Sequence, residues 1–505
     1  MINFIPNDPL TVDILPIRRV AARPDRPAGR AGISVASNAA EGRFEPGEPE
    51  FVAWQARQAA ILAIETWEDV LGKPLTSWAE ESVNPASLML VPDAGEDVNA
   101  YYDRESLSFF HKTKGAKTTY SGASTDCVAH ETGHGILDAL RPDLWLVNML
   151  EVGGFHEAFG DVTAIISALS DQATREALLG ISPDLSKANF VEATCEDLAD
   201  TARRVFGASF TASKPRRALN AFKWQLPSTM PKDGGPDVMM REVHSLARII
   251  TGCFYDVLRG IFVASGAPTQ ARLWTATKTA AALFYEAAGT APVGPRFFKA
   301  IGRSMVLADQ THNNGAHRTI IARAFLGHGL ALGADALLAP ELALAGASPK
   351  VRRNAIQLSP ATISDLRHRF GAGGRGPARV NLVELGGQSM ATVAMSHEVP
   401  LDKIDKRLRG VVATADSVAL VGESGGAAAL MAAPRTGAAS DEVLDFVSSL
   451  VAHNQVEFDG PPKAAKKRAA AAQKADPAAG ITTHAVKRRG SKQELQRIRF
   501  ACNVD

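Results

Sequence analysis

The stretch DCVAHETGHGILDAL, residues 126–140, contains two histidines four residues apart, with an acid directly after the first. Residues four apart share one face of a helix, so the imidazoles of His130 and His134 can point at one metal ion. Glu131 lies beside that face, where its carboxylate can hold a metal-bound water and act as a general base. The pattern alone is also compatible with a solvated helix face that binds no metal.

A catalytic zinc site needs a third protein ligand and one open coordination position. The class that takes a third histidine is excluded, because Leu140 stands where that histidine should be. Downstream, GGFHEAFGD (153–161) offers Glu157 as a ligand, with Asp161 one turn further along the same face. Asp161 can then accept the proton on the far nitrogen of a ligating histidine. Apolar neighbours such as Phe159 indicate burial rather than an exposed acidic face, and buried carboxylates are stabilised by a cation.

Together these segments resemble the thermolysin-like family of gluzincin zinc metallopeptidases. SGASTDCVAHETGHGILDAL (121–140) is similar to the family's active-site helix and the turn that leads into it, and Asp138 matches a family acid. HEAFGD resembles the family's Asn-Glu-x-x-x-Asp helix, with His156 in place of the asparagine. The resemblance implies one catalytic Zn²⁺ held by His130, His134 and Glu157, and an activity that hydrolyses peptide bonds.

Two further segments extend the resemblance, which covers about residues 85–333. NAYYD (99–103) is similar to the family segment at the edge of the active-site sheet, so Asn99 and Ala100 are expected to hold a substrate peptide in extended form. VHSLARIITGCFYDVL (243–258) resembles the helix that carries the family's catalytic histidine. This implies that His244 donates a hydrogen bond to the oxyanion that develops during hydrolysis.

Other positions depart from the family pattern. Asn148 aligns with the proton-donating tyrosine, and Asn220 aligns with the substrate-gripping arginine, for which Arg216 and Arg217 are nearby substitutes. No dense acidic cluster follows the second zinc helix, so structural calcium is not expected. These departures support a second hypothesis, in which the chain is a binding or scaffold protein that keeps a metal-stabilised gluzincin fold with weak or no turnover.

A third hypothesis, a serine hydrolase, comes from SVALVGESGGAAAL (417–430). Ser424 lies in a G-x-S-x-G pattern after an expected strand, as in a nucleophile elbow, and His453 and His484 lie downstream. Two strands joined by a glycine-rich turn explain the same residues, and the surrounding region is short for an α/β-hydrolase.

Hydrophobic periodicity predicts the elements that must position these residues. Residues 51–72 carry a helical pattern that stops at Gly72, whereas 87–92 and 106–110 read as strands. Most segments from 125 to about 333 have the helical period. After about 345, three alternating segments precede a helix expected from about Ser440 to Val451.

We therefore predict an α+β chain. An extended arm (1–48) precedes a zincin-like metallopeptidase domain (49–340), which combines a small mixed sheet, an active-site helix and a mainly helical subdomain. A separate C-terminal α/β domain of unknown role (345–505) follows, and it contains a low-complexity linker at 463–480.

Bulk composition limits the partners and the compartment. With a net charge of +1 over 505 residues, we expect no nucleic acid or anionic membrane partner. The family resemblance implies a peptide or protein as substrate. No stretch is apolar enough to span a bilayer, and the first twenty residues lack the apolar run of a signal peptide. The four cysteines form no CxxC pair and are expected to be buried thiols. We expect a cytoplasmic protein, with non-classical export and the oligomeric state left open.

Overall fold

The computed structural model describes residues 1–207, 216–235, 237–333, 361, 364, 379–385, 388–421, 436–458, 481–490 and 492–502. For residues 379–385, 388–397, 416–421, 436–439 and 489, it describes the backbone alone. Ser424 and the low-complexity segment 463–480 lie outside the described residues. The predictions made for them therefore stay predictions.

A five-stranded sheet forms the N-terminal part of the α+β fold, in the order β17-β5-β6-β4-β3. Strands β3, β4 and β6 run parallel, whereas β5 is antiparallel to β6 and β17 is antiparallel to β5. The bounds are β3 Gly32–Val35, β4 Ser87–Val91, β5 Ala100–Tyr102, β6 Ser106–Phe109 and β17 Phe500–Ala501. The strands expected at 87–92 and 106–110 are confirmed as β4 and β6.

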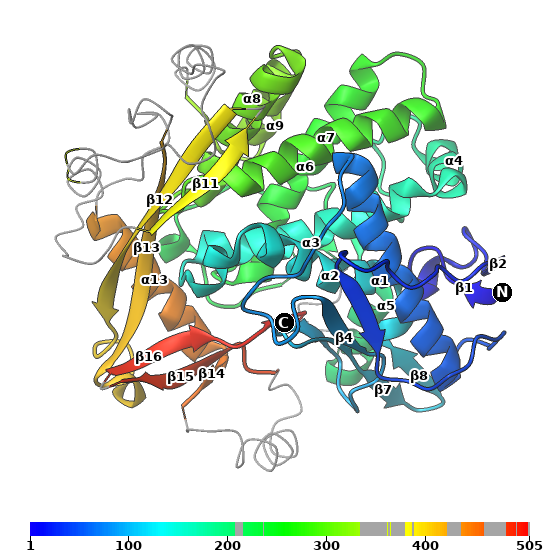
Figure 1. Ribbon diagram of the computed structural model, residues 1–505, viewed down its shortest axis with the longest axis horizontal. Helices are drawn as coiled ribbons and strands as arrows, with labels where there is room; N and C mark the ends of the chain where they lie inside the picture. The colour runs from blue at the N-terminus through cyan, green and yellow to red at the C-terminus, as the bar shows by residue number, and fades with distance from the viewer. Residues whose placement is uncertain are drawn as a thin grey trace.

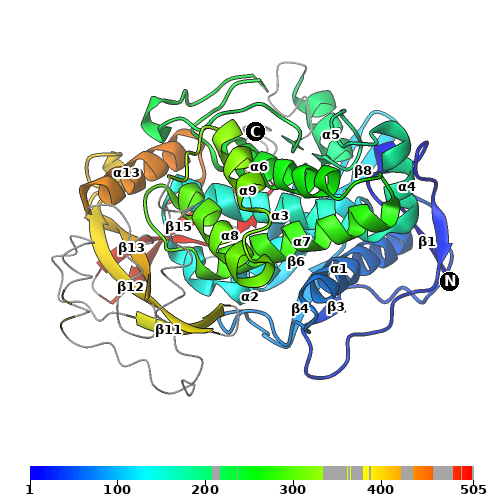
Figure 2. The ribbon, with the colours of Figure 1, turned by 90° about the horizontal axis from the view of Figure 1, so that it is seen from above.

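The first two helices of the chain pack on this sheet, and helices build most of residues 125–333, as the helical period predicts. They are α1 Pro49–Leu71, α2 Thr125–Leu140, α3 Leu150–Ser170, α4 Gln172–Ile181, α5 Glu196–Phe206, α6 Val243–Ala264, α7 Gln270–Thr290, α8 Phe297–Asn313 and α9 Arg318–Gly327. Helix α1 ends where the sequence predicts, because Gly72 has a φ of 63° and provides the left-handed C-cap. In Figure 2 the long helices α1, α3 and α7 lie to one side of strands β11–β13.

The C-terminal part contains a second sheet and one described helix, as expected of an α/β region. The sheet order is β11-β12-β13-β16-β15-β14, and parallel pairing occurs between β13 and β16 and between β14 and β15. The bounds are β11 Arg379–Leu385, β12 Gln388–Pro400, β13 Val411–Val421, β14 Val456–Glu457, β15 His484–Arg489, β16 Lys492–Arg497 and α13 Thr436–Ala452. After β16 the chain leaves this sheet and joins the N-terminal one as β17, so the C-terminal end of the chain lies near the centre of the molecule (Figure 1).

Residues 1–48 pack on the body of the protein. Strands β1 Ile2–Phe4 and β2 Arg18–Val20 form a ribbon, and β3 belongs to the five-stranded sheet. The buried side chain of Gln55 on α1 holds the backbone of Ile5 on both sides, accepting from its N–H at 2.9 Å and donating to its carbonyl at 3.0 Å. The remaining short strands form two ribbons: β7 His111–Lys114 with β8 Lys117–Tyr120, and β9 Ala193–Thr194 with β10 Arg216–Arg217.

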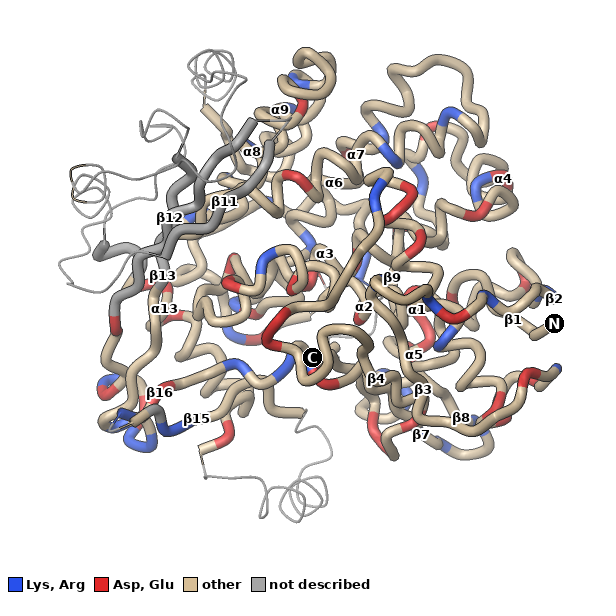
Figure 3. The backbone as a smooth tube through the Cα atoms, in the orientation of Figure 1, with Lys and Arg blue, Asp and Glu red and all other residues tan. Residues whose placement is uncertain are grey.

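One buried apolar cluster runs from the N-terminal sheet through α1–α9 and into the C-terminal sheet and α13. All four cysteines are buried free thiols, which confirms the expectation from their spacing. Basic and acidic residues are interspersed along the described chain (Figure 3). Within the described part of the chain, no helix is both long and apolar enough to cross a bilayer.

A buried carboxyl group lies where α13 packs on α3. Glu442 on α13 is 7% exposed and lies 3.2 Å from the Arg296 guanidinium. Burial and the negative charge of Glu151 on α3 raise the pKa of Glu442 to about 8, against the opposing effect of Arg296. The folded protein binds the proton of Glu442 more tightly than the unfolded chain does. The carboxyl group of Glu442 therefore lowers the free energy of unfolding as the pH rises from about 4.5 toward 8.

We therefore expect Glu442→Gln to raise the unfolding temperature at pH 9, by an amount that corresponds to roughly 2–4 kcal/mol. At pH 5 the native carboxyl group is protonated in the folded state, so the gain falls below about 1 kcal/mol. Thermal unfolding of the native chain and of the variant at pH 5 and at pH 9 measures the gain in stability. Glu398→Gln, at an exposed residue, is the matched control and should change little. An equal gain in stability at both values of pH would contradict the raised pKa of Glu442.

Candidate metal centre

The helix that carries both histidines begins at a capped N-terminus. Ser124 is the N-cap of α2, and its hydroxyl accepts a hydrogen bond from the Cys127 N–H. From Thr125 to Asp138 every residue of α2 is buried, so its histidines face protein on all sides. The solvated helix face that the pattern alone allowed is therefore not what the structure shows.

Two glycines let α2 approach α3 closely enough to enclose a histidine ring. A Cβ atom at Gly160 would lie 2.6 Å from both Cε1 and Nδ1 of His130. A Cβ atom at Gly133 would lie 2.7 Å from the Thr163 hydroxyl and 3.0 Å from the Gly160 Cα. Side chains at either position would separate the helices or displace the imidazole. Neither glycine was predicted as part of the site, although glycine inside a buried helix is a signal of close packing.

The three expected ligands come together between these helices. Ligand atoms of His130, His134 and Glu157 all lie within 4.8 Å of one another, and all three residues are buried. The Nε2 atom of His130 lies 3.3 Å from Glu157 Oε2, and the Nε2 atom of His134 lies 3.7 Å from Glu157 Oε1. Two imidazoles from one helix and a carboxylate from the next therefore converge on one point.

Asp161 lies directly behind the first histidine, as its spacing from Glu157 suggests. Its Oδ1 atom is 3.0 Å from His130 Nδ1 and 2.9 Å from the Arg216 guanidinium, and Thr194 donates to it at 3.2 Å. Arg216 thus holds the carboxylate that orients His130. The other arginine considered as a substrate contact, Arg217, pairs instead with Glu192 at 2.5 Å.

The second histidine has another imidazole as its partner. His134 Nδ1 lies 3.3 Å from Nδ1 of His156, the residue that replaces the family's asparagine. Asp138 faces elsewhere: it accepts from the Tyr102 hydroxyl at 2.9 Å and binds the Arg104 guanidinium at 2.8 and 2.6 Å. It therefore fixes α2 to the loop after β5.

Burial and charge give the two histidines opposite protonation behaviour. Burial lowers the pKa of His134 to about 3, so its ring is neutral and its Nε2 can donate a lone pair. Burial alone would lower the pKa of His130 as well, but the neighbouring Asp161 and Glu157 carboxylates raise it to about 10. Burial opposes ionisation of Glu157, yet the surrounding imidazoles hold its pKa well below the ordinary value. The negative Glu157 makes the centre attractive to a cation.

The expected general base has no hydrogen-bond partner for its carboxylate among the described residues. Glu131 has no exposed surface, and neither of its carboxylate oxygens has a hydrogen-bond partner among the described residues. Burial raises the pKa of Glu131 to about 8, although the nearby positive charge of His130 opposes this effect. A buried carboxyl group without partners is costly, and such groups are typical of functional sites.

His244 reaches the same centre from the first turn of α6. Its Nε2 atom lies 3.2 Å from Glu157 Oε2, and its Nδ1 atom lies 2.7 Å from Glu242 Oε1. Glu242 is the N-cap of α6 and also accepts from the backbone N–H groups of His244 and Ser245. Despite burial, the charges of Glu157 and Glu242 raise the pKa of His244 well above the ordinary value, and His244 lowers the pKa of Glu242 to about 2. The sequence analysis missed Glu242, whose signal was an acid directly before a helix.

The edge of β5 next to this centre is paired with another segment of the chain. Ala100 and Asn99 are buried, and the Asn99 Oδ1 atom accepts from the Ala100 N–H at 2.9 Å. Strand β17 lies alongside, with Phe500 opposite Tyr102 in the register. The two residues that were expected to hold a substrate peptide therefore lie at an edge that already holds an extended strand. Sequence reasoning gave no sign of this pairing.

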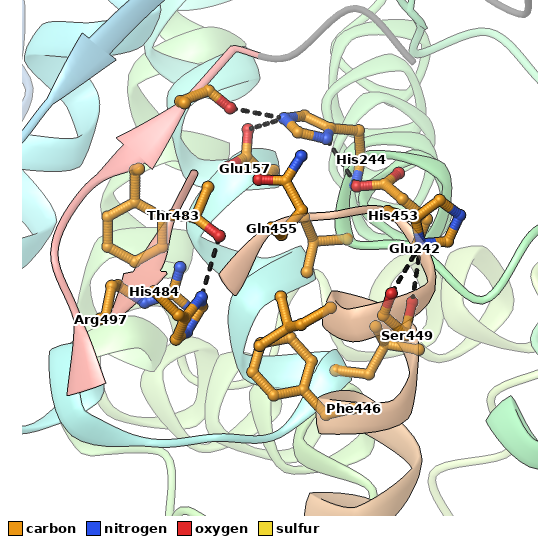
Figure 4. A pocket seen from close by; sticks show the side chains of 15 residues that line it. Glu157, Glu242, His244, Phe446, Ser449, His453, Gln455, Thr483, His484 and Arg497 are labelled. Carbon is orange, nitrogen blue, oxygen red and sulfur yellow. Dashed lines mark hydrogen bonds and ion pairs between the residues drawn. The ribbon is translucent and has the colours of Figure 1, made fainter. Parts of the chain in front are cut away.

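A pocket opens beside Glu157 and His244 (Figure 4). Its other walls come from α13 and from strands β15 to β17. Residues that line it include Phe446, His484 and Arg497. Burial lowers the pKa of His484 well below the ordinary value, so this histidine is neutral. The C-terminal part of the chain thus supplies one wall of the candidate site.

Two other positions that depart from the family pattern have structural roles. The Asn148 side chain donates to the carbonyls of Leu146 and Thr414, at 3.3 and 3.4 Å, and so connects the loop before α3 to β13. The Asn220 side chain donates to backbone carbonyls, including that of Arg248 on α6. Both amides hold backbone in place.

In comparisons with known proteins, no family model matches this chain and no curated protein matches it in sequence. The chemistry of the centre is therefore argued from its own geometry. Two imidazoles and a carboxylate are a ligand set that suits Zn²⁺, and the buried Nε2 of His134 has no hydrogen-bond partner among the described residues. The residues present thus fit a divalent cation.

The close approach of α2 and α3 can be tested through metal affinity. We expect Gly160→Ala to weaken zinc binding about tenfold or more, because the added methyl group displaces the His130 ring from its carboxylate partner. Competition with a chromogenic chelator measures the affinity. Gly180→Ala is the matched control, since an added Cβ on α4 meets nothing within 4 Å. Equal affinities in both variants would show that the glycine does not position the ligand.

Proposed function

We propose that this chain is a zinc-dependent metallopeptidase of the kind that its motifs resemble. The observation that supports this most directly is the convergence of His130, His134 and Glu157 within 4.8 Å of one another. Beside them lies Glu131, a buried carboxylate that has no protein partner among the described residues. Structural zinc sites are closed by four protein ligands, whereas three ligands beside a free carboxylate are typical of a hydrolytic site.

In this proposal His130, His134 and Glu157 hold one Zn²⁺. When bound, the ion supplies positive charge that polarises a peptide carbonyl and lowers the pKa of a water molecule. Asp161, itself held by Arg216, fixes the orientation of the His130 ring through its far nitrogen. The same three ligands also suit Fe(II), so metal analysis of the purified protein belongs with the first experiment.

Glu131 is the proposed general base and acid. Its carboxylate takes a proton from the attacking water and passes it to the departing amine. A group that performs both steps needs a pKa near the working pH, and burial brings that of Glu131 to about 8. The charge of a bound cation would lower this pKa, so the free carboxylate would be present at neutral pH.

His244 is the proposed hydrogen-bond donor to the oxyanion. Its ring is held on one side by Glu242 and faces Glu157 on the other. A peptide carbonyl already lies within its reach, because Ala501 O on strand β17 is 3.1 Å from His244 Nε2. An extended peptide along β5 would present its own carbonyl at this position, where the donor stabilises developing negative charge.

A metal-stabilised scaffold with little turnover is the second candidate. It is favoured by Asn148, whose side chain is bound to backbone carbonyls and provides no proton donor like the family's tyrosine.

The unpaired thiols suit a reducing compartment, so a cytoplasmic location stays part of the proposal.

The test of function is Glu131→Gln, compared with the native chain on a generic peptide library. We expect the variant to keep its zinc and to lose cleavage by about a hundredfold or more, because the substitution removes the base and leaves the three ligands. Mass spectrometry of the products and metal analysis give the two readouts. Glu50→Gln, at an exposed position on α1, is the control and should behave as the native chain. If the native chain and Glu50→Gln both bind zinc and neither of them cleaves peptide, the scaffold is favoured.

The pH profile tests the role of His244. Because its pKa lies well above the ordinary value, the ring stays protonated and able to donate from both nitrogens past pH 6.5. Glu242→Gln removes one of the two carboxylates that raise this pKa, so we expect the alkaline limb of kcat/KM to move to lower pH. Glu105→Gln, at an exposed residue, is the control. An unchanged alkaline limb would exclude His244 as the group that titrates there.

A further inference from the structure

Strand β17 enters the candidate active site from the C-terminal sheet. Its backbone is antiparallel to β5, with Phe500 opposite Tyr102 and Ala501 opposite Tyr101. The pairing continues one residue further, because the Cys502 N–H donates to the Ala100 carbonyl at 2.9 Å. A strand edge can hold one neighbour, so a peptide cannot pair with this edge while β17 is there.

The side chain of Phe500 covers one metal ligand. Its ring stacks on His134 with a centroid separation of 4.8 Å and on His156 with a separation of 3.9 Å. Trp145 meets it edge-on at 5.3 Å, and the Arg497 guanidinium lies over it at 4.1 Å. Phe500 is 2% exposed, so no solvent reaches His134 from this side.

The side chain of Cys502 reaches the other ligand and the general base. Its sulfur lies within 4.8 Å of ligand atoms of both His130 and Glu131, and it is 3.7 Å from the Arg216 guanidinium. Between Phe500 and Cys502, the carbonyl of Ala501 lies 3.1 Å from His244 Nε2. Three consecutive residues thus contact the residues proposed to bind the metal, move the proton and stabilise the oxyanion.

We propose that β17 is an internal inhibitor that occupies the position of the substrate peptide. Its backbone pairs with the edge of β5, and its Ala501 carbonyl lies at the proposed His244 donor. The Phe500 side chain covers His134, and the side chain of the next residue, Cys502, covers His130 and Glu131. The centre is closed while the strand is paired and opens when the strand leaves β5. This inference rests on the proposed function, because it names what regulates that same site.

The contacts of β17 suit a segment that can detach without unfolding the protein. The strand itself spans only residues 500–501. Just before it, the chain is anchored at Arg497, whose carbonyl accepts from the Trp145 indole N–H at 3.2 Å, and at Ile498, whose N–H donates to the Thr483 carbonyl at 2.9 Å. Release from residue 500 onward therefore leaves β16 and its sheet in place.

The test uses Cys502 as a reporter of strand release. Cys502 and Cys253 are both buried, but Cys253 lies on α6, away from the strand. In the full-length Glu131→Gln protein loaded with zinc, we expect an excess of the peptide Arg-Ile-Arg-Phe-Ala-Ser, which copies residues 497–501 and ends in serine, to accelerate alkylation of Cys502 about tenfold. Alkylation of Cys253 should not change. Peptide mapping by mass spectrometry reads both thiols without requiring any catalysis.

Phe500→Ala provides the second measurement. Loss of the ring that covers His134 should loosen the strand, raise the alkylation rate of Cys502 and increase cleavage of a peptide library at least tenfold over the native chain. Phe458→Ala, which removes an aromatic ring near Arg407 in the C-terminal part, is the matched control. It should change neither the alkylation rate of Cys502 nor the cleavage of the peptide library. Circular dichroism verifies that both variants are folded.

The outcomes separate this inference from the proposed function. If cleavage depends on Glu131 while Cys502 stays protected in the peptide experiment and in Phe500→Ala, the inhibitor is refuted and the peptidase stands. If Cys502 becomes reactive in both experiments but no variant cleaves peptide, β17 does occupy a peptide-binding edge and the peptidase fails. If the native chain loses the residues after 501 while Glu131→Gln keeps them, the strand is a substrate and the inhibitor is refuted.

Discussion

The position of the Glu157 carboxylate among three imidazoles is the interaction on which the rest of the centre depends. It lies 3.3 Å from His130, 3.7 Å from His134 and 3.2 Å from His244, although these residues come from α2 and α6 and Glu157 comes from α3. A buried carboxylate needs positive charge around it, and the protein provides that charge through protonated rings or through a bound cation. Close packing of α2 on α3 at Gly133 and Gly160 makes this convergence possible, because any side chain there would enter the space of Thr163 or of the His130 ring.

Around this carboxylate, a set of charged residues holds each ring in a defined state. Arg216 fixes Asp161, which in turn orients His130, and Glu242 fixes His244 from the N-cap of its helix. Such partners restrict the tautomer and the direction of each ring, so that the proposed ligands and the proposed donor are held in defined positions. Glu131 differs from the others, since none of the described residues satisfies its oxygens. Its lack of hydrogen-bond partners is the feature that favours the proposed hydrolytic centre over a structural one.

The C-terminal part of the chain belongs to the same site. Strand β17 completes the sheet that carries Ala100, and residues of α13, β15 and β16 line the pocket beside Glu157. The buried apolar cluster is continuous from the helices into this second sheet. The C-terminal sheet and α13 therefore form part of the walls of the candidate site.

The sequence by itself determined the local elements and the candidate ligands. Helical period and a glycine stop predicted α1, alternation predicted β4 and β6, and the four-residue spacings of His130 with His134 and of Glu157 with Asp161 placed each pair on one helical face. These are short-range properties, fixed by the geometry of a single helix or strand. Tertiary structure alone decided the partners: His156 behind His134, Arg216 on Asp161, and β17 on the edge of β5. Those contacts join segments separated by up to several hundred residues, and no local period records which distant segment will pack against another.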